Sequence, residues 1–102
     1  MFIATNRLFV PDDQVEGFER QFTDNMRTFL PGVPGLRRSV LLRPTAPGQP
    51  YVSVNEFDSR EAFEDWVSSA SFKTAHARNR SMARHITDNA VETFDVTEDL
   101  AL

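Results

Sequence analysis

The chain has 102 residues, a net charge of −4 and no cysteine, and 40% of its residues are hydrophobic. This length and apolar content predict one domain with one core, spanning residues 1–102. The acidic balance argues against nucleic acid as a partner, because binding to phosphates needs a basic surface. The lack of cysteine excludes disulfides, zinc–thiolate sites, iron–sulfur clusters and thiol nucleophiles.

No apolar run approaches the roughly 20 residues that a membrane-spanning helix needs. The N-terminal stretch "MFIATNRLFV" has neither the basic region nor the cleavage-like site of a signal peptide. We therefore expect a cytoplasmic protein that makes no membrane contact.

Residues 2–10 alternate between apolar and polar side chains, which predicts a half-buried strand. The apolar side carries Phe2, Ala4, Leu8 and Val10. Asn6 breaks the pattern, because its amide falls on the apolar side.

A helix is predicted next, with Asp13 and Glu16 as its N-terminal capping pair and Pro31-Gly32 as its end. Its apolar residues recur at helical spacing: Val15, Phe18, Phe22, Met26 and Phe29. Strands are expected near 35–43 and 51–57, joined by the stiff connection "PTAPGQP".

A second helix follows, with Asp58 and Glu61 as its expected capping pair. One stripe of this helix carries Ala62, Phe63, Trp66 and Val67. The letters "SSAS" interrupt it, and either Ser69 or Ser71 can cap a third segment that runs to about residue 82. The stretch "NAVETFDVTE" predicts the last strand.

This order of elements predicts an α+β fold of the ferredoxin-like, split βαβ type with an antiparallel sheet. Most of the strands carry apolar residues on both sides, so both faces of the sheet need cover. The helices cover one face. A second copy of the chain, packed sheet to sheet as a C2 homodimer, would cover the other.

His76 is the first candidate for chemistry, on a helical face with Phe72 and Asn79. A lone histidine on such a face is usually a hydrogen-bonded core residue. Its neighbours include a group of cations: Lys73, Arg78, Arg80 and Arg84. They form either a solvated basic face or the rim of an apolar slot whose ligand has carboxylate tails.

Trp66 and Asn6 are the other candidates. A single tryptophan on an amphipathic helix normally fills core volume. An amide on the apolar side of a strand needs hydrogen-bond partners, since leaving them unmade costs about 1–3 kcal/mol. Asn6 is therefore either bonded to a neighbouring backbone group or a directed donor inside a pocket. His85 and His76 lack the accompanying ligand pattern of a zinc site.

Three stretches occur in a familiar order: "NRL" from Asn6, "AFEDW" ending at Trp66, and "FKTAHARNR" containing His76. In these stretches the chain resembles the IsdG-type haem-degrading monooxygenases, which belong to the antibiotic-biosynthesis-monooxygenase superfamily of dimeric α+β barrels. The functional triad of that family is an asparagine on the first strand, a tryptophan on the second helix and a histidine on the following helix. The resemblance carries these roles to Asn6, Trp66 and His76.

The resemblance implies that haem is both cofactor and substrate, with O2 and a reductase or other electron donor as further partners. His76 would be the metal ligand, holding the haem iron through a neutral imidazole nitrogen. Asn6 would donate a hydrogen bond on the opposite side of the porphyrin, and Trp66 would push the macrocycle out of plane. Phe22 and Phe72 would form pocket walls, and Arg80 is among the cations expected near the propionates.

The segment after Arg80, "SMARHITDN", departs from the family pattern and leaves the propionate contacts open. Two alternatives to haem degradation also stay open. One is a cofactor-free monooxygenase of quinols or polyphenols, in which His76 acts as a general base. The other is a haem-binding protein without enzymatic activity.

Overall fold

The computed structural model describes residues 1–70, 72–74, 77 and 88–102. Its elements follow the expected order of strand, helix, strand, strand, helix, strand, with a short 3-10 turn before the first helix. They are β1 (Phe2–Phe9), the turn Asp12–Gln14, α1 (Val15–Phe29), β2 (Leu36–Leu42), β3 (Tyr51–Phe57), α2 (Arg60–Val67) and β4 (Asp88–Asp95).

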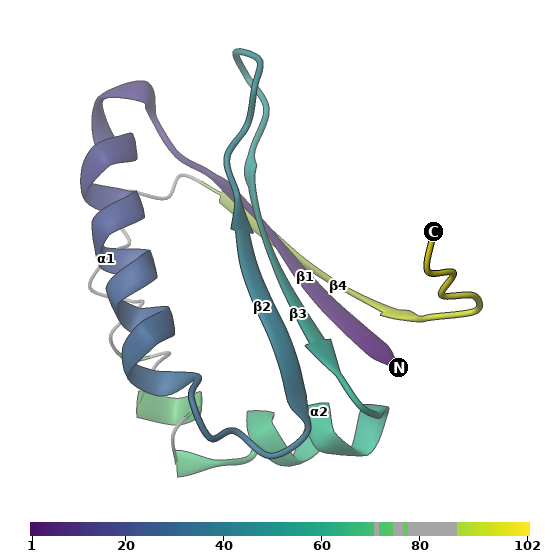
Figure 1. Cartoon of the computed structure of the whole chain (residues 1–102). Coiled ribbons are helices and arrows are strands. Elements are labelled where there is room, and N and C mark those ends of the chain that lie inside the picture. The colour runs from purple at the N-terminus through teal and green to yellow at the C-terminus, as the bar shows by residue number, and fades with distance from the viewer. Residues whose placement is uncertain (71, 75–76, 78–87) are drawn as a thin grey trace.

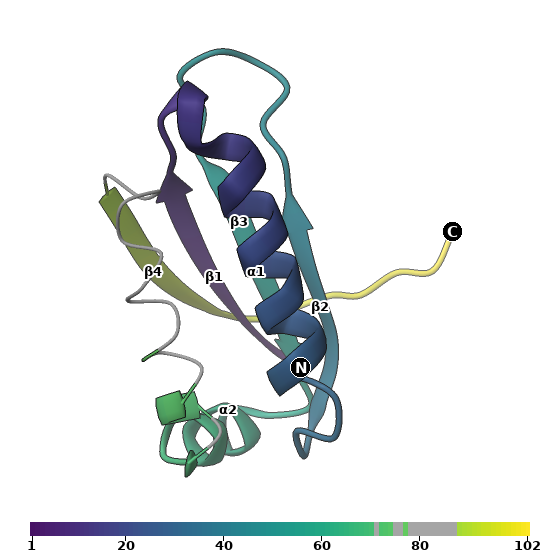
Figure 2. The same ribbon diagram turned by 90° about the vertical axis from the view of Figure 1, so that its left-hand side faces the viewer.

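The strands form one four-stranded sheet in the order β2-β3-β1-β4, and every neighbouring pair is antiparallel. This arrangement confirms the predicted ferredoxin-like fold. Helix α1 runs along one face of the sheet, and α2 lies near the end of the sheet where β3 finishes (Figure 1). The view from the side shows α1 in front of the strands, while the C-terminal tail points away from them (Figure 2).

Side chains on the helix-facing side of the sheet change in size along β1 and β3. The pairing places Phe2 opposite Phe57 at one end and Leu8 opposite Tyr51 at the other. All four of these side chains are buried. Between them, Ala4 lies opposite Asn55 and Asn6 lies opposite Ser53. The sheet therefore presents bulky apolar pairs at both ends and small or polar pairs in the middle.

The two helices pack against the bulky ends. On α1, the ring of Phe18 lies 4.9 Å from that of Tyr51 and is fully buried. On α2, the ring of Phe63 lies 5.3 Å from that of Phe2 and 5.5 Å from that of Phe57. Such tilted and edge-on contacts are favourable geometries for aromatic pairs. They hold the helices over the two ends of the strands and leave the middle less filled.

The helix starts differ in part from the sequence expectation. The capping pair predicted from Asp13 is wrong, because α1 continues from the 3-10 turn and its N-cap residue makes no side-chain hydrogen bond. The cap of α2 is Ser59 rather than Asp58, since the Ser59 hydroxyl accepts a hydrogen bond from the Ala62 N–H at 3.1 Å. Ser69 caps the next helical segment through the Phe72 N–H. Across the described residues, no helix combines the length and apolar character needed to span a membrane.

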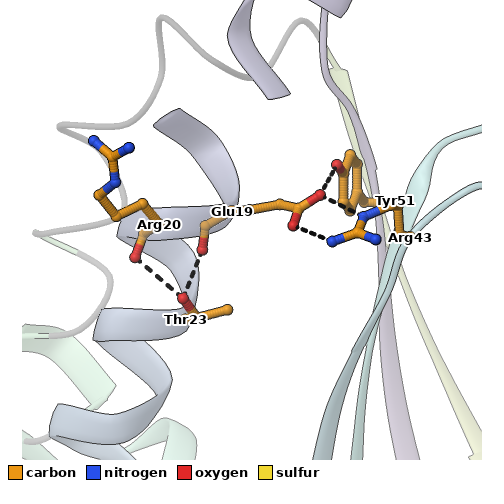
Figure 3. Close-up of polar contacts among 5 residues, drawn as sticks. All are labelled: Glu19, Arg20, Thr23, Arg43 and Tyr51. Atoms are coloured by element: carbon orange, nitrogen blue, oxygen red, sulfur yellow. Dashed lines mark hydrogen bonds and ion pairs between the residues drawn. The ribbon is translucent and has the colours of Figure 1, made fainter. Parts of the chain in front are cut away.

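A polar cluster joins α1 to the β2–β3 hairpin (Figure 3). Arg43 donates to both carboxylate oxygens of Glu19 at 2.7 Å, and the Tyr51 hydroxyl donates to the same carboxylate. The hydrogen bond from Arg43, followed by that from Tyr51, lowers the pKa of Glu19 to about 2. Burial and the contact with Glu19 raise the pKa of Tyr51 to about 12, so its phenol stays protonated.

Gly35 sets the distance between the start of β2 and α2. Its φ is +76°, and an added Cβ would lie 2.5 Å from Cβ of Ala62. Its carbonyl accepts a hydrogen bond of 2.8 Å from the N–H of Asp58, just before α2. The missing side chain therefore allows α2 to lie close to β2, one turn before Trp66.

The Glu19 cluster predicts a specific dependence of stability on pH. A carboxyl group whose pKa falls from 4.5 to about 2 on folding stabilises the folded state above pH 4.5, and this contribution disappears as the pH falls toward 2. Thermal unfolding should therefore give Glu19→Gln a lower Tm than the parent at neutral pH, with the two values converging at about pH 2. A difference in Tm that stays constant with pH would contradict this role of Glu19.

Gly35 and Gly32 form a matched pair for a second test, because both have positive φ but a Cβ at Gly32 meets no described atom within 4 Å. Gly32→Ala should cost about 1–2 kcal/mol of unfolding free energy from backbone strain alone. Gly35→Ala should cost clearly more, because it also collides with Ala62. Chemical denaturation measures both values. Equal losses of unfolding free energy in the two variants would show that the close approach of Gly35 to α2 does not make this position more sensitive to an added side chain.

Candidate functional site

The less filled middle of the sheet is the floor of a pocket of about 220 Å³ that lies between the sheet and the two helices. Its floor comes from β1, β2 and β3, and its walls come from α1, α2 and the residue Phe72. Val91 of β4 lies beside Asn6 of β1; it also lines the pocket and is 64% exposed. The pocket is therefore a direct consequence of the small side chains in the middle of β1 and β3.

The residues predicted from the sequence can now be located. Asn6, Phe22, Trp66 and Phe72 all line this one pocket, although they come from distant parts of the chain. His76 and Arg80 lie outside the described residues. The pocket thus brings together the described members of the predicted site, while their chemical roles stay predictions.

Asn6 reaches the pocket because of its position in β1. Side chains alternate along a strand, so Asn6 shares the helix-facing side with Ala4 and Leu8. Arg7 points to the other face, where its Nε lies 2.9 Å from Oε1 of Glu92. This placement directs Arg7 away from the pocket. Lys73 remains exposed next to Phe72.

Packing alone fixes the indole of Trp66. Its ring lies 5.7 Å from Phe57 and 4.9 Å from Phe72, the latter in an edge-on arrangement. Its Nε1 is shielded from water and has no hydrogen-bond partner among the residues that the structure describes. Such an unmade hydrogen bond costs about 1–3 kcal/mol. The aromatic contacts of Trp66 therefore outweigh this cost and present a flat apolar wall to the pocket.

Sequence analysis missed a set of uncharged polar residues in the same pocket: Asn25, Ser39, Ser53 and Asn55. Ser53 and Asn25 are only 7% and 8% exposed. A signal was available, because Ser53 and Asn55 share one side of β3 with the buried Tyr51 and Phe57. The argument that identified Asn6 applies to them equally.

The described lining of the pocket carries no charged side chain. In the same part of the chain, no group of three or more His, Asp or Glu residues is arranged to hold a metal ion. Flat aromatic walls and neutral amides suit a flat, largely apolar ring better than a free cation. A porphyrin carries its own four nitrogen ligands for iron, so it fits these residues and needs from the protein only an axial ligand.

A second hollow of about 470 Å³ lies between α2 and the loop before β2. It shares Phe29 and Trp66 with the first pocket, but Glu61 and Asp65 also line it. Carboxylates repel a ligand with acidic tails. The pocket above the sheet, whose described lining carries no charge, is therefore the candidate site.

A ferredoxin-like sheet with an aromatic pocket between its helices and its floor defines a small α+β domain with a candidate ligand site. The family described as antibiotic biosynthesis monooxygenase matches residues 1–78. The chain belongs to this family, as the sequence resemblance predicted.

Individual relatives divide into two kinds. A heme-degrading monooxygenase of Bacillus cereus is 34% identical over 68 residues, which cover 66% of this chain and 62% of that protein's length. The heme degrader MhuD of Mycobacterium tuberculosis, solved with two hemes in its active site, is 26% identical with a TM-score of 0.81 over 99% of this chain and all of that one. SnoaB of Streptomyces nogalater, a cofactor-independent oxygenase, shares the fold at 23% identity and a TM-score of 0.76, over 97% and 95% of the two chains.

Proposed function

We propose that this chain is a haem-degrading monooxygenase that binds haem as its substrate and opens the porphyrin ring with O2 and an external electron donor. The observation that carries the proposal is the convergence of Asn6 and Trp66 on one pocket whose described lining is largely aromatic and without charge. The B. cereus relative and MhuD, which are both named for heme degradation, support haem as the ligand.

The residues of the chain then have distinct tasks. Bound haem supplies the iron at which O2 is activated. His76 would hold this iron, and Asn6 would donate a hydrogen bond toward O2 from its fixed position on a rigid strand. Trp66 would pack its indole against the ring and constrain its shape. Phe22 and Phe72 keep water from the buried edge of the ring, and Arg80 meets a propionate.

A second candidate function is a cofactor-free oxygenation of a quinol or polyphenol. The uncharged polar residues on the pocket floor favour it, because they suit phenolic hydroxyl groups. In this alternative His76 takes a proton from the phenol as a general base. Oxygen uptake on a quinol by iron-free protein distinguishes this function from haem degradation.

The open face of the sheet supports a homodimer as the working form. Its apolar residues lie side by side across the strands: Ile3 beside Phe94, Val40 beside Val54, and Leu42 beside Val52. Leu42 and Phe94 are 49% and 48% exposed. Apolar side chains exposed on one face of a sheet mark an interface. A second copy packed on this face would bury them and form the dimeric α+β barrel expected from the sequence.

The dimer proposal predicts the effect of one charge on this face. Val54→Asp places a carboxylate between Thr5 and Val40, where a partner sheet would exclude water. Sedimentation velocity at micromolar concentration should show the parent as a dimer and Val54→Asp shifted to monomer. Gln49→Asp, in the exposed loop between β2 and β3, adds the same charge as a control and should remain dimeric. A monomeric parent would contradict the proposal.

The haem proposal predicts the effect of the axial ligand. Titration of the protein with hemin should give a Soret band that is lost in His76→Ala and retained in His85→Ala. Addition of ascorbate in air should then bleach the band as the ring opens, with release of iron measured by a chelator.

Retention of the band in His76→Ala would contradict the assignment of the ligand. A band that forms but resists reductant would indicate a haem-binding protein without enzymatic activity.

A further inference from the structure

Three uncharged polar side chains lie together in the middle of the sheet and form what we call the polar floor: Ser39 of β2 with Ser53 and Asn55 of β3. Ser39 lies opposite Asn55 in the register of the two strands, and Ser53 is the next residue of β3 on the same side. All three line the pocket. Tyr51 and Phe57, which continue the same side of β3, are 3% and 0% exposed. The polar floor therefore occupies positions where a sheet that only packed against helices would carry apolar residues.

The hydrogen bonds of the polar floor are only partly made within the protein. The Ser39 hydroxyl donates to Oδ1 of Asn55 at 2.6 Å. This bond fixes the orientation of the amide and leaves its NH2 group as the available donor. Neither that NH2 group nor the Ser53 hydroxyl makes a hydrogen bond to a residue that the structure describes. Within the described part of the chain both groups lack a partner, and water or a bound ligand can supply one.

The surroundings restrict the chemistry of that partner. Across the pocket, the walls are largely aromatic, with one buried amide, that of Asn25, among the rings of Phe22, Phe29, Phe63, Trp66 and Phe72. No cation lies among the described lining residues. An ionised carboxylate or phosphate in contact with the floor would find no counter-charge among these described residues, and burying a charge without one is costly. A neutral hydroxyl or carbonyl oxygen would accept from the Asn55 amide without that cost.

We propose that the polar floor is a subsite for an uncharged oxygen substituent, a hydroxyl or a carbonyl, on the buried edge of a flat ring ligand. The inference rests on the proposed function only for the location of the ring in this pocket. Two kinds of ligand carry such a group: a porphyrin with a hydroxylated or acylated edge, and a polycyclic phenol or quinone. Asn55, positioned by Ser39, selects such an edge over a purely hydrocarbon one.

The test compares ligands that differ only at this edge. Iron haematoporphyrin carries hydroxyethyl groups where hemin carries vinyl groups, on the edge opposite the propionates. Dihydroxyanthracene and anthracene form the corresponding pair of tricyclic ligands. One neutral hydrogen bond contributes about 0.5–1.5 kcal/mol, so the parent should bind the oxygenated member of at least one pair about three- to ten-fold more tightly.

Two variants remove the proposed contact. The double variant Ser39→Ala/Asn55→Leu deletes both partners of the internal hydrogen bond, so it leaves no buried group without its partner. Ser53→Ala is the milder change and serves if the double variant does not fold. Ser68→Ala, whose hydroxyl donates to the Glu64 carbonyl on the exposed side of α2, is the control and should keep the preference. The preference should disappear in the double variant and decrease in Ser53→Ala.

The outcomes separate this inference from the proposed function. Tighter binding of the oxygenated ligand in either pair supports the subsite. The pair that shows it identifies the kind of ligand that the subsite accepts. Equal affinity within both pairs, or a preference that survives both the double variant and Ser53→Ala, overturns it. Degradation of hemin without any such preference would leave the proposed function intact and the subsite disproved. If the protein does not bind hemin but prefers the oxygenated tricyclic ligand, the subsite is supported and the proposed haem-degrading function is contradicted.

Discussion

The distribution of side-chain size on one side of the sheet determines where the helices pack and where the pocket forms. Phe2 with Phe57, and Leu8 with Tyr51, form bulky pairs at the two ends of β1 and β3. The helices rest on these ends through aromatic contacts that are favourable in themselves. Close packing would require equally bulky residues in the middle, but Ala4, Asn6, Ser53 and Asn55 stand there instead. The hollow, its aromatic walls and its polar floor all follow from this arrangement.

The sequence was sufficient to predict the fold, because alternation in the strands and helical spacing in α1 and α2 are local signals. Asn6 could be predicted as a pocket residue for the same reason. The contacts that fix Trp66 could not be predicted from the sequence. They depend on Phe57 and Phe72, which contact Trp66 only in the folded chain. The polar floor also needed the register, which brings Ser39 of one strand opposite Asn55 of another. The capping pair predicted for the start of α1 was wrong, because a 3-10 turn leads into the helix there and no side chain caps it.

The fold alone does not choose between haem and a phenol, since related oxygenases of both kinds share it. Two properties of the pocket bear on the choice. Its aromatic walls and the position of Asn6 suit a porphyrin that brings its own nitrogen ligands. Its polar floor offers hydrogen bonds that a hydrocarbon edge leaves unused, so an oxygen substituent on the buried edge of the ring is expected to strengthen binding. Membership of the family therefore indicates monooxygenase chemistry, while the polar floor restricts the range of ligands that bind well.

The central claim is that a flat ring binds between the sheet and the helices, against Trp66 and Asn6. The most direct measurement is solution NMR of the protein with gallium protoporphyrin IX, a diamagnetic substitute for hemin. We predict nuclear Overhauser contacts from the porphyrin to the indole of Trp66, the side-chain amide of Asn6 and the ring of Phe22. Contacts confined to the open face of the sheet, at Val54 and Leu42, would contradict the claim, and so would the absence of any contact to Trp66.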